Sequence, residues 1–197
     1  MKGILLLILV LTPPSFGQKY TFGTCPSVQS YVFAGFYTTF NVADTYYVYA
    51  ISPSLFFHQW NCLSFQITRI GTTAQYTVAV SGVNKFTGAP LSANGVLTVS
   101  GHLATATATT VTDLFTFTFS DGWKSFSESY YLLETVANLD YIVLYGCDSF
   151  GWGKKENALI LTTTTTITPD VASRALSALM AKGYPLHAVR TYVGCQT

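Results

Sequence analysis

The stretch Phe115-Thr116-Phe117-Thr118-Phe119 places an aromatic ring at every second position and a hydroxyl between the rings. Successive side chains of an extended strand point to opposite faces, so this stretch predicts a strand with one apolar and one solvent-facing side. The same period of two recurs at residues 63–68 and 75–80. Strands of this kind are typical of antiparallel sheets, which bury one face and leave the other in water.

Turn-forming residues divide the region from about residue 60 to 165 into short segments. Further strands are predicted at about residues 130–136, 139–147 and 158–163. About eight successive hairpin-linked strands would leave two open sheet edges, and closure into a barrel removes both edges. The interior of an eight-stranded barrel can hold one small ligand. The sequence therefore predicts a single all-β domain, an eight-stranded antiparallel up-and-down barrel.

One segment near the C-terminus has helical spacing instead. Thr168 can cap a helix, Pro169 suits its first turn, and Asp170 suits the positive end of the helix dipole. Apolar residues within 171–179 then share one face, and a Gly and a Pro end the run. We expect one amphipathic helix that packs against an apolar surface, followed by a short final strand at about residues 186–193.

The composition excludes several classes of protein. Ten Lys and Arg residues face nine Asp and Glu residues, and 49% of the chain is hydrophobic, 15% aromatic and 10% charged. Disordered chains have the opposite composition. A nearly neutral chain also lacks the electrostatic footprint of a protein that binds nucleic acid or an anionic membrane.

The N-terminus is predicted to be an export signal. Lys2 precedes an eight-residue apolar run at residues 4–11, and Ser15-Phe16-Gly17 has the small-x-small pattern of a cleavage site. Eight apolar residues are too few to span a bilayer, which needs about 20. We therefore expect a signal peptide at residues 1–17, a mature domain at 18–197, no membrane span, and a secreted, extracellular protein.

Four cysteines remain after cleavage, namely Cys25, Cys62, Cys147 and Cys195. An even number in an exported chain predicts two disulfides, with three pairings that spacing cannot decide. The sequence contains no close C-x-x-C pair of the kind that binds a metal ion, so no metal site is predicted. Signatures of nucleophilic, metalloprotease or phosphate-loop chemistry are also missing from the sequence. We expect no catalytic residue, no cofactor and no enzymatic activity.

The sequence resembles a lipocalin, and specifically the apolipoprotein D, insecticyanin and crustacyanin branch. The motifs that carry this resemblance fall in family order: Cys25-Pro26, Phe40-Asn41-Val42, Cys62-Leu63-Ser64-Phe65, Tyr141-Ile142-Val143-Leu144-Tyr145-Gly146-Cys147 and Thr168-Pro169-Asp170-Val171. The resemblance implies an eight-stranded barrel with one C-terminal helix packed on its outside. It also implies that Cys25 pairs with Cys147 and Cys62 with Cys195.

Two family residues at the closed base of the barrel are replaced together. The Gly-x-Trp of the first strand corresponds to Thr45-Tyr46-Tyr47, with Tyr47 at the Trp position, and Thr163 takes the place of the family's Arg. An Arg without its aromatic neighbour would lose a cation–π contact, so joint loss is physically coherent. We expect different packing to close the base, with Tyr47 in it.

The many aromatic residues give the candidate ligand site. Ligand cavities are mostly apolar and aromatic, with a few polar groups that fix orientation, although plain core packing is an equal alternative for each residue. Alternation predicts the inward direction of most candidates, whereas the direction of Tyr131 and Tyr145 stays open. Tyr76 and Tyr145 are favoured as polar contacts, because buried hydroxyls need partners. The candidates are Tyr47, Phe65, Tyr76, Val78, Phe115, Phe117, Tyr131 and Tyr145.

The resemblance implies extracellular binding and transport of a small hydrophobic ligand, such as a fatty acid, retinoid, sterol, carotenoid or bilin. The alternative is an interaction protein with a side-chain-filled barrel, which would act through apolar loops and self-association as a homo-oligomer. The apolar loop 52–60 contains Leu55, Phe56, Phe57 and Trp60. It is predicted to be a lid, a self-association patch or a tip that touches membranes transiently.

Overall fold

The computed structural model describes residues 19–28, 44–52, 54, 56–71, 74–100, 114–120, 125–136, 139–192 and 195. The predicted signal peptide, the Phe40-Asn41-Val42 motif and Leu55 lie outside these residues.

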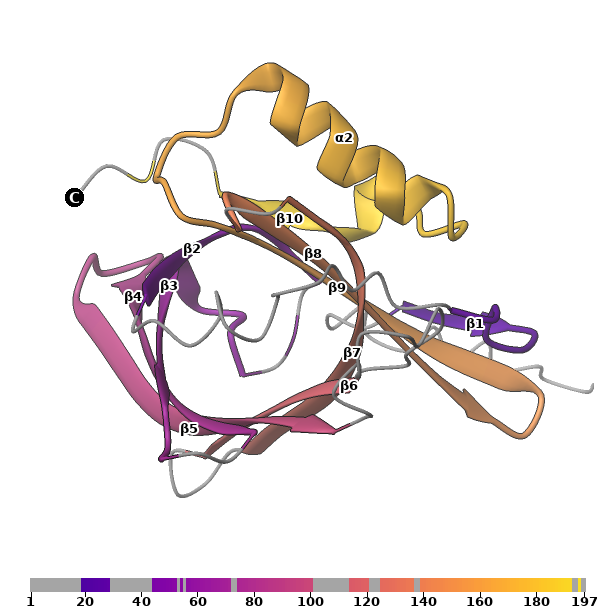
Figure 1. Ribbon diagram of the computed structural model, residues 1–197, viewed down its shortest axis with the longest axis horizontal. Helices are drawn as coiled ribbons and strands as arrows, with labels where there is room; N and C mark the ends of the chain where they lie inside the picture. Colours follow the sequence, from indigo (N-terminus) through magenta and orange to yellow (C-terminus); the bar gives the residue numbers. More distant parts are fainter. Residues whose placement is uncertain are drawn as a thin grey trace, which may run out of the picture.

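Eight antiparallel strands form a closed barrel (Figure 1). Each strand pairs with the next one along the chain, and the last pairs back with the first, where Tyr47 lies opposite Thr162. This closure confirms the predicted fold class. The strands are β2 (Asp44–Ile51), β3 (Trp60–Arg69), β4 (Gln75–Asn84), β5 (Pro90–Ser100), β6 (Leu114–Ser120), β7 (Ser125–Thr135), β8 (Tyr141–Phe150) and β9 (Gly153–Thr162).

Two short strands extend this sheet. β1 (Lys19–Phe22) pairs with the start of β9, and β10 (Arg190–Thr191) pairs with the end of β2. The predicted final strand is therefore too long, because a 3₁₀ turn at Leu186–Ala188 takes up its first part. β10 is short because β3 leaves only the end of β2 open for a further partner.

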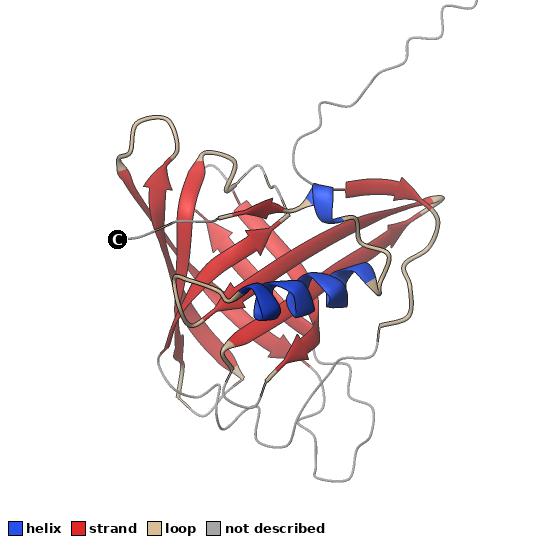
Figure 2. Ribbon diagram, turned by 90° about the horizontal axis from the view of Figure 1, so that it is seen from above, coloured by secondary structure: helices blue, strands red, loops and turns tan. Residues whose placement is uncertain are grey.

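The predicted helix is present as α2 (Pro169–Met180), and it lies across the outside of the barrel (Figure 2). The Thr168 side chain caps it by accepting a hydrogen bond from the backbone N–H of Val171 at 3.4 Å. Ala175 and Leu179 are buried against an outer cluster of β8 and β9 residues. No helix in the described part of the chain is both long and apolar enough to cross a membrane.

At the base of the barrel, the tyrosine that faces the interior lies one position before the predicted one. Tyr46 is buried in the interior cluster, whereas Tyr47 is only partly buried and lies on the outer face of β2. Burial, followed by the charge of Asp44, raises the pKa of Tyr46, so its hydroxyl stays protonated. The expectation that Tyr47 packs inside the base is wrong, because alternation along β2 turns its neighbour inward instead.

Two disulfides fasten the chain ends to the barrel. Cys25 is bonded to Cys147 and Cys62 to Cys195, across sequence separations of 122 and 133 residues. The first bond holds the segment after β1 to β8, and the second holds the C-terminal segment to β3. Both pairings agree with those implied by the family resemblance.

Replacing Cys62 and Cys195 together by Ser should lower the free energy of unfolding by about 2–5 kcal/mol, because the long loop is no longer closed in the unfolded chain. Urea unfolding measures the loss. Peptide mapping without reduction checks the pairing in the wild-type protein, and a peptide that links Cys25 to Cys62 would contradict it.

Candidate functional site

The barrel interior is lined with aromatic and aliphatic side chains. Five candidates belong to the buried interior cluster, as alternation predicts: Phe65, Tyr76, Val78, Phe115 and Phe117. Burial raises the pKa of Tyr76, so its hydroxyl remains a neutral hydrogen-bonding group. These residues come from β3, β4 and β6, which together with β5, between β4 and β6, form one wall of the barrel.

Tyr131 and Tyr145 lie on the other face of the sheet. β7 turns Tyr130 and Leu132 inward, so Tyr131 faces outward opposite its register partner Tyr145. Tyr145 is fully buried, but in the cluster beneath α2, where its ring meets that of Tyr184 at 6.1 Å. The direction that the sequence left open for these two candidates is therefore outward, and neither lies on the inner wall.

The loop between β2 and β3 folds over the open end of the barrel. Phe57 is only 2% exposed, and its ring lies 5.3 Å from that of Phe126 and 5.7 Å from that of Phe119. Phe56 stacks on Phe119 at 6.0 Å. The Ser54 hydroxyl accepts a hydrogen bond from the Phe57 backbone at 3.1 Å and so holds the turn. Of the three interpretations left open, this packing favours a lid.

A polar cluster faces the interior just below this lid. Glu128 on β7 is 5% exposed. Its Oε1 accepts a hydrogen bond from Lys155 Nζ at 2.8 Å, and its Oε2 accepts one from Asn157 Nδ2 at 2.5 Å. Both partners lie on the inner face of β9, beyond β8. We call these three residues the mouth cluster.

Gly146 makes this arrangement possible. It lies on β8, between the strands that carry the mouth cluster, and pairs in register with Asn157. Without a side chain there, Asn157 can reach across β8 to Glu128. A Cβ at position 146 would collide with the backbone carbonyl oxygen of Ser129 and lie 3.6 Å from the Cβ of Asn157.

Burial dominates the electrostatics of the mouth cluster. Desolvation raises the pKa of Glu128, although the hydrogen bonds and charge of Lys155 and the amide of Asn157 oppose the shift. Burial, with the charge of Glu128, also raises the pKa of Tyr130 well above its usual value. The site therefore combines a carboxyl group, an ammonium group and a neutral phenol next to aromatic rings.

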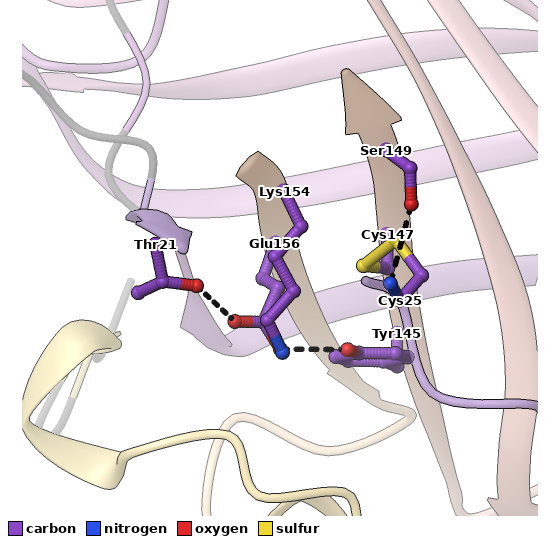
Figure 3. Close-up of a disulfide and its surroundings, with 7 residues drawn as sticks. All are labelled: Thr21, Cys25, Tyr145, Cys147, Ser149, Lys154 and Glu156. Carbon is purple, nitrogen blue, oxygen red and sulfur yellow. Dashed lines mark hydrogen bonds and ion pairs between the residues drawn. A yellow bond between two sulfur atoms is a disulfide. The ribbon is translucent and has the colours of Figure 1, made fainter. Parts of the chain in front are cut away.

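A second buried carboxyl group supports this end of the barrel from outside (Figure 3). Glu156 is fully buried on the outer face of β9. It accepts hydrogen bonds from Tyr145 at 2.7 Å and from Thr21 of β1 at 3.3 Å, and it pairs with Lys154 at 3.1 Å. Cys147 of the nearby disulfide is its register partner. Tyr145 therefore has a structural partner outside the barrel.

A groove of about 310 Å³ opens on the outside of the barrel, over β2, β3 and β4. Tyr47 lines this groove and not the interior. The other side chains around it include Tyr49, Ser64, Ser81, Thr165, Ile167 and the disulfide of Cys62 and Cys195. Within the described residues, no three His, Cys, Asp or Glu side chains are grouped as a metal site would require.

The sequence did not reveal the mouth cluster. The alternation that directs Phe126 and Tyr130 inward also directs Glu128 inward, and this signal was available. Its partners could not be found in the same way, because every residue of β9 from Glu156 to Thr162 is buried and the strand shows no alternation.

No protein-family model matches the sequence, and no significant match is found among curated proteins. Solved structures do match. Insecticyanin from the tobacco hornworm Manduca sexta is 18% identical, with 89% of each chain covered and a TM-score of 0.65. H1 crustacyanin from the lobster Homarus americanus is 15% identical, with 91% of each chain covered and a TM-score of 0.64. The siderocalin Ex-FABP is 10% identical, covering 80% of this chain and 97% of its own, at a TM-score of 0.54.

Replacing Gly146 by Ala should lower the free energy of unfolding by about 1–3 kcal/mol, because the new methyl group meets fixed backbone atoms. Urea unfolding measures this loss. Ser125→Ala, at an exposed position of β7, is the control and should stay within about 0.5 kcal/mol of the wild type. Equal stability of both variants would show that the sheet has room at Gly146.

Proposed function

We propose that this chain, which has the lipocalin fold, is a secreted carrier that binds a small hydrophobic ligand inside its barrel and catalyses no reaction. The observation that carries the proposal is the inner wall, in which aromatic side chains lead to one buried polar cluster below a lid. This combination of a large apolar surface and a few polar groups is typical of ligand sites.

The comparisons support the same function. The fold is shared with the siderocalin Ex-FABP, which functions through dual ligand specificities. Secretion is supported by the two disulfides, which persist in oxidising compartments, and by the predicted signal peptide at residues 1–17. The five inward candidates, from Phe65 to Phe117, are proposed as the apolar lining, with the mouth cluster as the polar end.

Replacing Phe117 or Tyr76 by Asp should weaken binding of the neutral fluorescent probe N-phenyl-1-naphthylamine at least tenfold, because an unpaired charge would enter the apolar wall. Fluorescence titration of the secreted, oxidised protein measures the affinity. Thr118→Asp and Gln75→Asp are matched controls, since these neighbours face solvent. Equal losses from inward and outward changes would contradict a binding site inside the barrel.

A second candidate function is self-association, which a different surface favours. The hairpin of β8 and β9 extends beyond the barrel with β1 beside it (Figure 1). Phe22 and Trp152 stack there at 4.9 Å while remaining 81% and 73% exposed, and Tyr20 packs against Phe150 at 5.8 Å. Because β1 is an edge of the described sheet, the same strand of a second copy is the partner that fits.

If this surface forms a dimer, replacing Phe22 and Trp152 together by Ser should convert the dimer to a monomer, because the stacked rings would no longer be buried between copies. Sedimentation velocity measures the oligomeric state. Phe86→Ser, at an exposed position of the β4–β5 turn, is the control. A wild-type protein that sediments as a monomer at all concentrations would exclude this second candidate.

A further inference from the structure

We propose that the mouth cluster selects a ligand with a protonated amine, and that it disfavours a carboxylate. This inference rests on the proposed function, because it takes the barrel interior as the binding site. It adds the chemical class of the ligand's polar end.

The charges at this end of the barrel favour a cation. Among the described residues here, Glu128 on β7 is buried, Lys155 on β9 is partly buried, and Asp148 on β8 is exposed. Asp148 and Lys155 are register partners, and Glu128 pairs with the same Lys155. The buried Glu128 carboxyl group attracts a ligand cation and repels a ligand anion, and the charge of Asp148 acts on the same group.

A ligand carboxylate would find the nearby donors already engaged. Lys155 Nζ and Asn157 Nδ2 both point at Glu128, at 2.8 and 2.5 Å. The buried Glu128 cannot turn into solvent to release them. An entering carboxylate would therefore lie close to a second carboxylate in a region of low dielectric, where like charges repel strongly.

A ligand ammonium group, in contrast, can exchange with an existing partner. The Lys155 side chain is 20% exposed, so it can turn towards solvent and towards Asp148 on the adjacent strand. A ligand ammonium group then takes its place at Glu128, and the charge of that pair is unchanged. Arg69 is at the other end of β3, far along the barrel wall from this exchange.

Aromatic rings surround the position that the ammonium group would take. Phe117 lies opposite Glu128 in the register of β6 and β7, and Phe126 and Tyr130 flank it on its own strand. The face of an aromatic ring attracts a cation, and the same rings provide apolar surface for the rest of the ligand. The ligand class is thus an amine that carries an aromatic or aliphatic group.

The test compares two ligands with equal chains, dodecylamine and laurate, as competitors of N-phenyl-1-naphthylamine at pH 7. We expect dodecylamine to displace the probe from the oxidised full chain at a concentration at least tenfold lower than laurate does. Glu128→Gln should weaken dodecylamine at least tenfold and leave laurate equal or tighter, because Lys155 loses its carboxylate partner. Glu134→Gln, on the outer face of β7, is the matched control and should keep the wild-type ratio.

Lys155→Met provides an independent test if Glu128→Gln does not fold. Removing the competing ammonium group should tighten dodecylamine and weaken laurate. If laurate binds the wild type as tightly as dodecylamine, or if Lys155→Met loses dodecylamine binding, the amine preference is overturned while the carrier function stands. If neither ligand nor the probe binds, the proposed function itself is overturned.

Discussion

Barrel closure is the constraint on which the rest of the structure depends. β9 pairs with both β8 and β2, so the sheet has no open edge between them and its inner face encloses an interior. Inside such a wall, a polar side chain is stable only with a partner. Glu128 is stable there because the side chains of Lys155 and Asn157 reach it across β8. Gly146 leaves room for this contact on β8.

β9 connects the two sides of this wall. Lys155 and Asn157 face the interior, while Lys154 and Glu156, the residues between and beside them, face outward. The outward Glu156 accepts a hydrogen bond from Thr21 of β1, and the inward pair holds Glu128, the candidate ligand contact. The alternation of a single strand therefore couples the anchoring of the N-terminal strand to the position of the polar groups inside the barrel.

Alternation predicted the inner wall well where one face of a strand is solvated, as with Phe65, Tyr76 and Phe117. It failed on β8, where the residues from Tyr141 to Gly146 are buried on both faces, so Tyr145 could not be assigned to a side. Residues 46 and 47 are both tyrosines, and the sequence predicts Tyr47 at the inward position, whereas Tyr46 is the one that faces the interior. The mouth cluster depends on the register of three strands, which no local pattern contains, whereas the disulfide pairing followed from the family resemblance.

The closing contacts also set the order in which the chain can fold. The Thr162 hydroxyl meets the Tyr47 carbonyl across 115 residues, and the native partners of Cys25 and Cys62 follow them by 122 and 133 residues. During synthesis, which begins at the N-terminus, Cys25 and Cys62 are both present long before either of their native partners has been made. Contacts this distant in sequence form slowly. Correct oxidation of this protein therefore requires that Cys25 and Cys62 either stay reduced or exchange an early, wrong bond once Cys147 and Cys195 are present.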